Sequence, residues 1–198
     1  MGFWDAVMGR SRPKQANLDA LFAVPTAALT LQTALGFVPT GDGAVCYRAA
    51  AGAGFADAQG DLVALLSQKA TGEAVPNVST QTDTFGFTWL LVDNDPLDAT
   101  APDLTGLCTD LHAVNTTLEQ DGFGPGLLCS LIPFADSAGR KVALVYLYKQ
   151  GTFYPFAPTG PSTRDNLLEI QVRDAVKGDL PLEGDLGRWM ALWGAPGL

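Results

Sequence analysis

The sequence predicts an α+β domain in which an antiparallel sheet packs against helices. Residues 127–156 form the densest apolar stretch, and two short polar and glycine-containing segments, 135–139 and 150–151, divide it into three extended runs. Such runs are typical of a three-stranded antiparallel meander. Apolar residues at helical spacing over 103–121 predict a helix that covers this sheet.

Both alternating sets of side chains in the first two runs of the meander are apolar. In the second run, one set contains Val142, Leu144 and Tyr146, and the other contains Ala143 and Val145. A sheet with one face in water would not require this pattern. We therefore expect these strands to be central, with one face under the long helix and the other under a second helix, a terminal segment or a partner chain.

The first half of the chain is predicted to contribute two helical segments followed by strands and a further helix. A helical pattern opens at Asn17, and Pro25 starts a second segment because proline lacks the amide hydrogen that a helix interior needs. Gly36 ends that segment. The remaining elements are a strand, a helix, an exposed polar loop and a strand, over residues 44–50, 55–69, 73–84 and 85–92.

The second half is predicted to end in a helix and a tail. Pro155 lies in the third run of the meander and has no amide to donate, so this strand belongs at a sheet edge. Ser162 or Thr163 caps the last helix, which ends at Gly178. The tail beyond it closes in a short amphipathic turn.

The length of 198 residues suits one domain with appended ends. We divide the chain into an N-terminal arm over 1–16, a single α+β domain over 17–178, and a C-terminal tail over 179–198 that packs on the domain or on a partner. An apolar content of 47% with 17% charged residues indicates a folded chain. The order of strand, helix, meander and helix is loosely similar to secretion-chaperone-like folds.

The charge pattern argues against nucleic-acid binding, and the hydropathy argues against a membrane span. The net charge is −9 and the basic residues are scattered, whereas a nucleic-acid binder needs clustered Lys and Arg. The longest unbroken apolar run, 142–148, is far shorter than the ~20 residues of a membrane span, and no secretory leader is apparent. We expect a cytoplasmic protein whose membrane contact, if it makes any, is peripheral and at the inner face.

Cofactor and metal motifs do not fit this sequence. Cys46, Cys108 and Cys129 show no C-x-x-C spacing and sit among apolar neighbours, as buried thiols in a reducing cytoplasm do. Residues 51–57 resemble a dinucleotide-binding turn, but Asp57 occupies the place of the third glycine. We predict no catalytic, cofactor-binding or metal-binding residues.

One alternative keeps an enzymatic or ligand-binding role open. His112 is the only histidine and lies four residues after Cys108 on the predicted helix, so their side chains could meet. Asp93, Asp95 and Asp98 follow a strand, although the spacing lacks the Gly and Glu of an EF-hand loop. A small hydrolase or ligand-binding domain would use His112 or these acids.

Aromatic residues near the ends of the chain and at the sheet edge are candidates for contact with a partner. Trp and other aromatic residues are enriched at binding hot spots. Trp189 and Trp193 are four residues apart and would share one face of a helical turn. The candidate partner-binding residues are Phe3, Trp4, Phe153, Tyr154, Trp189 and Trp193.

Several longer stretches together carry a family resemblance. They are MGFWDA at 1–6, NLDALFAVPTAALTL at 17–31, GFVPTG at 36–41, TWLLVD at 88–93, the helix at 104–119 and LVYLYKQGTFYPFAP at 144–158. With these stretches the chain resembles the PspA-associated protein family PspAB over nearly its whole length. The resemblance transfers no catalytic residue.

The resemblance implies a function. Members of the family are soluble bacterial and archaeal proteins whose genes accompany those of the membrane-stress protein PspA and of an HtpX-type membrane protease. We therefore expect a non-enzymatic accessory protein of the phage-shock response, which binds PspA, another phage-shock component or an HtpX-type protease. The expectation includes a possible homodimer and no cofactor.

Overall fold

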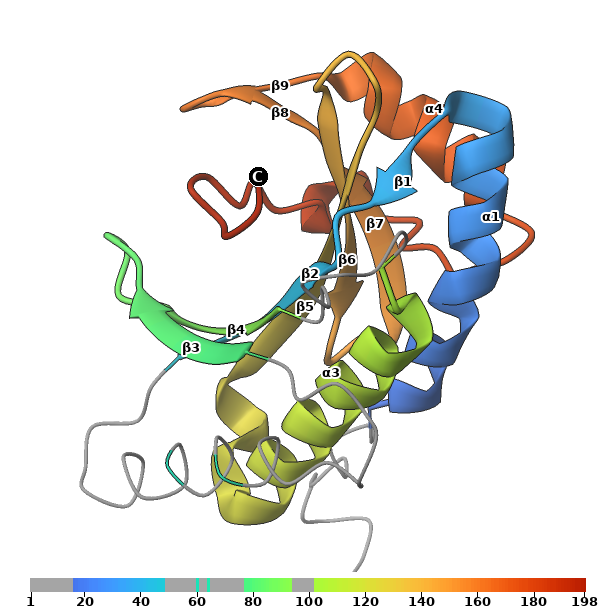
Figure 1. Cartoon of the computed structure of the whole chain (residues 1–198). Helices are drawn as coiled ribbons and strands as arrows, with labels where there is room; N and C mark the ends of the chain where they lie inside the picture. Colours follow the sequence, from blue (N-terminus) through green and yellow to red (C-terminus); the bar gives the residue numbers. More distant parts are fainter. Residues whose placement is uncertain (1–15, 49–59, 61–63, 65–76, 94–101) are drawn as a thin grey trace, which may run out of the picture.

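The computed structural model describes residues 16–48, 60, 64, 77–93 and 102–198 (Figure 1). In these parts of the chain the elements follow the order η1 (Leu18–Ala23), α1 (Val24–Leu35), β1 (Val38–Pro39), β2 (Asp42–Tyr47), β3 (Asn77–Thr82), β4 (Thr88–Asp93), α3 (Leu104–Leu118), η2 (Glu119–Phe123), η3 (Gly124–Gly126), β5 (Leu127–Ala135), β6 (Lys141–Leu147), β7 (Thr152–Phe156), β8 (Pro158–Gly160), β9 (Thr163–Arg164), α4 (Asn166–Val176) and η4 (Leu186–Arg188).

The centre of the fold is a seven-stranded sheet with the order β3-β4-β2-β5-β6-β7, in which β1 adds to β5. Each pair of neighbouring strands is antiparallel. With helices packed on this sheet, the predicted α+β class is confirmed. Strands β5, β6 and β7 follow one another in the chain and lie side by side. Pro155 lies in β7, the last strand in the order, as its missing amide requires.

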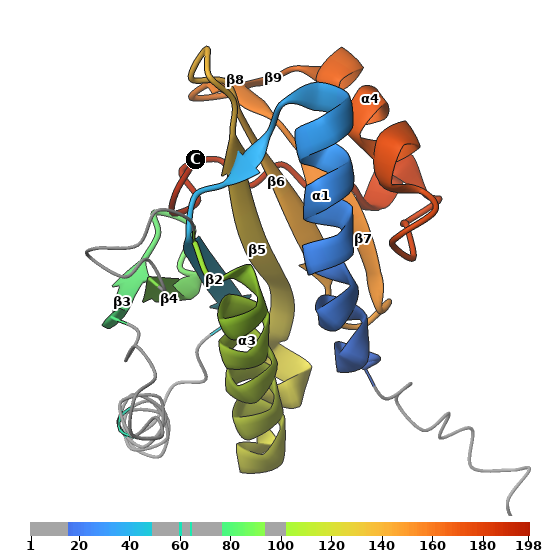
Figure 2. The same ribbon diagram turned by 45° about the vertical axis from the view of Figure 1, so that its right-hand side comes forward.

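Helices α1, α3 and α4 cover one face of the sheet. Leu107 and Leu111 of α3 are fully buried there, together with Ile132, Phe134 and Leu144 of the sheet. Figure 2 shows α1 and α3 side by side in front of the strands, and in Figure 1 the C-terminus lies on the other side of the strands from α1 and α4. The prediction that the long helix covers one face is therefore confirmed.

Helix α3 begins after Asp103, a residue type that the sequence indicates as a suitable start. The carboxylate of Asp103 accepts a hydrogen bond of 2.9 Å from the amide of Gly106. A side-chain oxygen at this position satisfies one of the amides that the first turn leaves without a partner. This cap fixes the residue at which α3 begins.

The N-terminal helical pair follows the prediction. The 3₁₀ helix η1 runs into α1, Pro25 lies in the first turn of α1, and Gly36 ends the helix with a φ of 75°. Among the described residues, one helical segment, Leu18–Leu35, is long and apolar enough to cross a membrane by length and composition alone. A core helix passes the same test, and Leu21 and Leu31 of this segment are fully buried in the core.

The other face of the sheet lies under the last part of the C-terminal tail, from Trp189 onward. Trp189 and Ala195 of the tail are buried against Leu131, Val145 and Tyr154 of the strands, and these residues form a second apolar cluster. The two-sided apolar pattern of the central strands is thus covered on both faces. Helices cover one face and an irregular segment covers the other.

Three expectations about individual elements were wrong. Residues 77–82 were expected in a polar loop, but they form β3, which pairs with β4 along its whole length. Asp165 caps α4, because the residues before it form the β8–β9 hairpin that contains Thr163. The helical turn of the tail ends at Arg188, so Trp189 and Trp193 do not share a helix face.

Two expected elements lie largely outside the described residues. The N-terminal arm is described only from Ala16, and the helix expected over 55–69 only at Gly60 and Ala64, both of which are helical.

The contact of α3 with β2 requires a residue without a side chain at position 43. A Cβ atom on Gly43 would lie 2.9 Å from Cδ1 of Leu107 and 3.1 Å from Cδ1 of Leu111. We predict that Gly43→Ala lowers the free energy of unfolding by about 1–3 kcal/mol, the usual cost of overpacking a core. Urea unfolding measures the difference. Gly184→Ala is the control, since nothing lies within 4 Å of its added Cβ. Equal stability of the two variants would contradict the tight contact.

Candidate functional site

The tail is fastened to the sheet by aromatic contacts. The ring of Trp189 stacks on Tyr154, with 5.9 Å between the ring centroids, and the ring of Trp193 meets the edge of Phe156 at 5.3 Å. Tyr154 and Phe156 both lie in β7 and are fully buried. Residues two apart on a strand point to the same face, so β7 presents both rings to the tail.

Side-chain donors hold the backbone of the tail. The hydroxyl of Tyr154 donates to the carbonyl of Met190 at 3.0 Å, and Nη1 of Arg164 donates to the carbonyl of Trp189 at 2.9 Å. Lys141 donates from Nζ to the carbonyl of Gly197 at 3.0 Å. This face of the sheet therefore binds a peptide segment, through its apolar rings and its backbone oxygens.

A buried ion pair positions one of these donors. Nε of Arg164 lies 2.8 Å and 3.0 Å from the two carboxylate oxygens of Glu169, whose side chain is 2% exposed. Glu169 also accepts from the amide of Ala157 at 2.9 Å, and the guanidinium lies over the ring of Phe156 at 5.0 Å. The pair joins α4 and β9 to the first tight turn of the tail, so it sets where Trp189 lies.

Glu183 fastens the start of the tail to the outer edge of β7. Its amide donates to the carbonyl of Phe153 at 2.7 Å, and its carboxylate accepts from Thr152 and from the amide of Asp185. Burial alone would raise the pKa of Glu183, but the hydrogen bonds from Asp185, Thr152 and Arg188 outweigh burial and lower that pKa. The carboxylate is therefore ionised at neutral pH.

The tail leaves an apolar groove beside it, which we call the tail groove. It has a volume of about 550 Å³ and lies between the β3–β4 turn, the ends of β2, β5 and β6, and residues 190–193. This volume is in the range of ligand sites in proteins. Its apolar lining includes Phe85, Phe87, Leu128, Leu147, Met190 and Trp193.

Two cationic side chains line the same groove. Arg48 is exposed and lies over the ring of Phe87, with 5.4 Å from Cζ to the ring centroid. Lys149 is exposed and donates from Nζ to the carbonyl of Pro125 at 3.1 Å. The ring of Phe87 and the carbonyl of Pro125 are neutral groups, so these contacts leave both positive charges in place. This end of the groove is therefore positive.

Asp83, the acid among the described lining residues, is held by its own turn. Its carboxylate accepts from the amides of Phe85 and Phe87, at 2.9 Å each, and from Nε1 of Trp89 at 3.0 Å. Burial would raise the pKa of Asp83, but the hydrogen bonds from Trp89, Phe87 and Phe85 outweigh it and lower that pKa. The acid thus shapes one wall of the groove.

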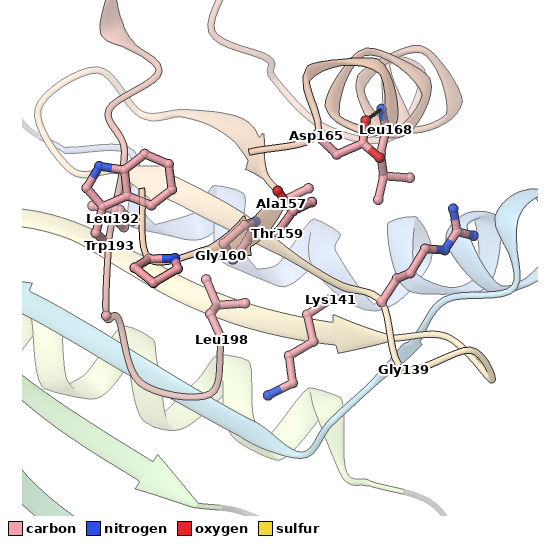
Figure 3. A pocket seen from close by; sticks show the side chains of 14 residues that line it. Gly139, Lys141, Ala157, Thr159, Gly160, Asp165, Leu168, Leu192, Trp193 and Leu198 are labelled. Carbon is pink, nitrogen blue, oxygen red and sulfur yellow. Dashed lines mark hydrogen bonds between the residues drawn. The ribbon is translucent and has the colours of Figure 1, made fainter. Parts of the chain in front are cut away.

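A second hollow lies on the other side of Trp193 (Figure 3). It has a volume of about 540 Å³, and Figure 3 shows Leu192, Trp193 and Leu198 of the tail around it with Lys141 and Thr159. Leu192 and Trp193 line both hollows. The tail therefore crosses the sheet between two hollows and does not fill the face it covers.

Two of the three cysteines form part of the groove. Cys46 of β2 and Cys129 of β5 lie directly opposite each other, and both are buried. A hydrogen bond with the Cys129 thiol, followed by burial, raises the pKa of Cys46. Burial raises the pKa of Cys108, which lies on the buried side of α3, to about 12. The prediction that the three cysteines are buried is confirmed.

The residues of the alternative enzymatic site are not brought together in the described structure. The ring of His112 stacks on Phe22 at 5.1 Å, and its Nε2 lies 3.5 Å from the carboxylate of Asp19. Cys108 is fully buried in the core. Asp93 ends β4, whereas Asp95 and Asp98 lie outside the described residues. The described residues contain no group of three or more His, Cys, Asp or Glu that could hold a metal ion.

The predicted partner residues have different environments. Phe153 and Tyr154 are fully buried and Trp189 is 8% exposed, so these side chains pack inside the molecule. Trp193 is half-buried and, with Tyr154, lines the tail groove. Phe3 and Trp4 lie outside the described residues. The assignment of these aromatic residues to a partner surface stays a prediction.

The sequence analysis did not identify the residues that give the groove its exposed apolar walls and its positive charge. Phe85 and Met190 are 65% and 61% exposed, and Arg48 and Lys149 supply the charge. The Phe-Gly-Phe sequence at 85–87 was a usable signal, since it places two aromatic rings on a tight turn. No signal in the sequence joins this turn to the tail, about 100 residues later.

The family model for PspAB, described as PspA associated protein B, matches residues 1–197. The chain belongs to the PspAB family. The resemblance drawn from the sequence is confirmed. A search of curated proteins and a search of solved structures each found no match.

Loss of Arg164 should be far more harmful than loss of an exposed arginine. We predict that Arg164→Ala lowers the free energy of unfolding by about 3–5 kcal/mol, because it leaves the carboxylate of Glu169 buried without its ion-pair partner. The control, Arg173→Ala, breaks a half-exposed pair with Asp174 and should cost less than about 1 kcal/mol. Urea unfolding compares them, and equal losses would contradict the structural role of the pair.

Acid should loosen the start of the tail through Glu183. Because its folded-state pKa lies below the ordinary value of 4.5, Glu183 stabilises the fold above that value and loses this effect as pH falls through the folded-state pKa. We predict that Glu183→Gln costs about 1–3 kcal/mol at neutral pH and reduces the loss of stability below about pH 4.5. Urea unfolding across pH tests this, with the exposed Asp174→Asn as control. A parallel pH profile in wild type and Glu183→Gln would count against it.

Proposed function

We propose that this PspAB protein is a non-catalytic accessory protein of the PspA membrane-stress response and that it acts by binding PspA. The family match over residues 1–197 supports the association with PspA. The binding mode is supported by the tail groove, an apolar hollow with exposed side chains on two of its walls.

The groove is the observation that carries the binding role. Exposed apolar patches that border a hollow mark interaction sites, whereas isolated exposed apolar residues are ordinary. Phe85 comes from the β3–β4 turn and Met190 from the tail, so two elements far apart in sequence bring large exposed apolar side chains to one site. A partner that covered these side chains would remove apolar surface from water, which favours association.

Direct binding can be tested with purified proteins. We predict that the immobilised full-length chain retains purified PspA of the same organism, whereas an unrelated acidic protein of similar size does not. A solubilised HtpX-type protease from the same organism forms a second arm, because the family resemblance implies that partner too. Loss of the gene should lower survival under envelope stress, and a wild-type copy should restore it. Absence of PspA retention together with unaltered survival would overturn the proposal.

A further inference from the structure

The tail groove combines an apolar floor with a positive end. Cys46 and Cys129 are buried and lie on the sheet beside Leu128 and Leu147. Arg48 and Lys149 are the cationic side chains among the described lining residues, and Asp83 is the acid. Asp83 keeps its negative charge while it accepts three hydrogen bonds from its own turn, and among the described residues no ion pair joins it to Arg48 or Lys149, so the two cations outnumber the acid in this lining.

This positive end stands out from the charge of the whole chain. The net charge is −9, with 21 acidic and 12 basic residues. Two cations at one end of an apolar groove complement a ligand that has an apolar body and a negative group. Carboxylates and phosphates are the groups that Arg and Lys bind in proteins by charge-assisted hydrogen bonds.

The chemistry of the neighbouring surface indicates a peptide as the source of this ligand. Beside the groove, the same sheet face already holds a peptide segment, the tail, through aromatic contacts and donors to backbone carbonyls. Tyr154 belongs to both sites, since its ring lines the groove while its hydroxyl donates to the carbonyl of Met190. Trp193 also packs on β7 and lines the groove. A second segment laid beside the tail would therefore continue an interface that this chain forms with itself.

We propose that the tail groove binds a peptide segment that carries apolar side chains and an acidic residue. The apolar side chains cover the floor between Phe85 and Met190, and the carboxylate pairs with Arg48 and Lys149. This inference rests on the proposed function, because it assigns the site and the chemistry of the partner that the protein binds there.

Short overlapping peptides that cover the PspA sequence of the same organism are the probes. Each is labelled with a fluorophore and titrated with the full-length protein, and fluorescence anisotropy gives the dissociation constant. We expect the peptides that bind to contain apolar residues with an Asp or Glu. Binding should also shift the tryptophan emission, since Trp89 and Trp193 line the groove.

Charge reversal at the positive end is the first variant. Arg48 and Lys149 are exposed, so Arg48→Glu with Lys149→Glu leaves the core intact. We expect about tenfold weaker peptide binding or more. The matched control, Arg173→Glu with Lys177→Glu, makes the same change in net charge on α4, which packs on the helix-covered face. It should bind peptides as the wild type does. Equal binding by both double variants would overturn the proposal.

Removal of an apolar wall is the second variant. Phe85→Ala removes a ring that is 65% exposed and should weaken binding of the same peptides about fivefold or more. Leu167→Ala on α4, where Leu167 is 69% exposed, is the control and should leave binding unchanged. Equal affinities of Phe85→Ala and wild type would overturn the assignment of this groove.

Full-length PspA and lipid vesicles separate the remaining outcomes. If wild type and the groove variants retain full-length PspA equally, or if no peptide binds, the groove is not the site and the proposed function stands. If phosphatidylglycerol vesicles shift the tryptophan emission and no peptide does, the groove binds lipid and the peptide assignment is wrong. If wild type retains no full-length PspA, the proposed function fails and this inference fails with it.

Discussion

The fold depends on one constraint, which is that both faces of the central strands are apolar and must be kept from water. Along β5, Ile132 and Phe134 face the helices while Cys129 and Leu131 face the tail, and all four are buried. Helices satisfy the constraint on the first face in the usual way, with stripes of apolar side chains laid on the sheet. The second face is covered by a segment with a single short 3₁₀ turn. That segment has to be held by individual contacts, which explains why an ion pair, stacked rings and side-chain donors converge on it.

One face of the sheet is covered by helices and the other by an irregular segment, and this difference explains where the hollows lie. A helix presents rows of side chains at regular spacing, and neighbouring helices fill the grooves between those rows. A single irregular segment has no such rows, so it covers a strip of the sheet and leaves space on both sides. The hollows of about 550 and 540 Å³ share Leu192 and Trp193 as lining residues, as this account requires. The candidate site is thus a consequence of how the second face is covered.

Much of the fold could be predicted from the sequence, because many of its elements depend on patterns among neighbouring residues. The apolar alternation of residues 127–156, the stripe of α3 and the proline in β7 each report on a nearby physical requirement. Strand β3 could not be predicted in this way. Its sequence, NVSTQT, has no apolar alternation, and its extended form depends on pairing with β4. The groove could not be predicted for a related reason. Its walls come from segments far apart in the chain, and the position of the tail beside the β3–β4 turn depends on the Arg164–Glu169 ion pair and on the stacking of Trp189 on Tyr154.

The charges at the groove follow from the same local requirements. Asp83 closes the β3–β4 turn by accepting from two amides and one indole, and these hydrogen bonds hold its carboxylate against its own turn. Arg48 is kept beside the groove by the ring of Phe87, and Lys149 by the carbonyl of Pro125, since both of these contacts leave the positive charge intact. Two cations held by neutral groups outnumber the one acid among the described lining residues, so this end of the groove is positive on a protein with a net negative charge. The shape of the site therefore comes from the tail, and its sign of charge comes from the hairpin and the ends of the strands.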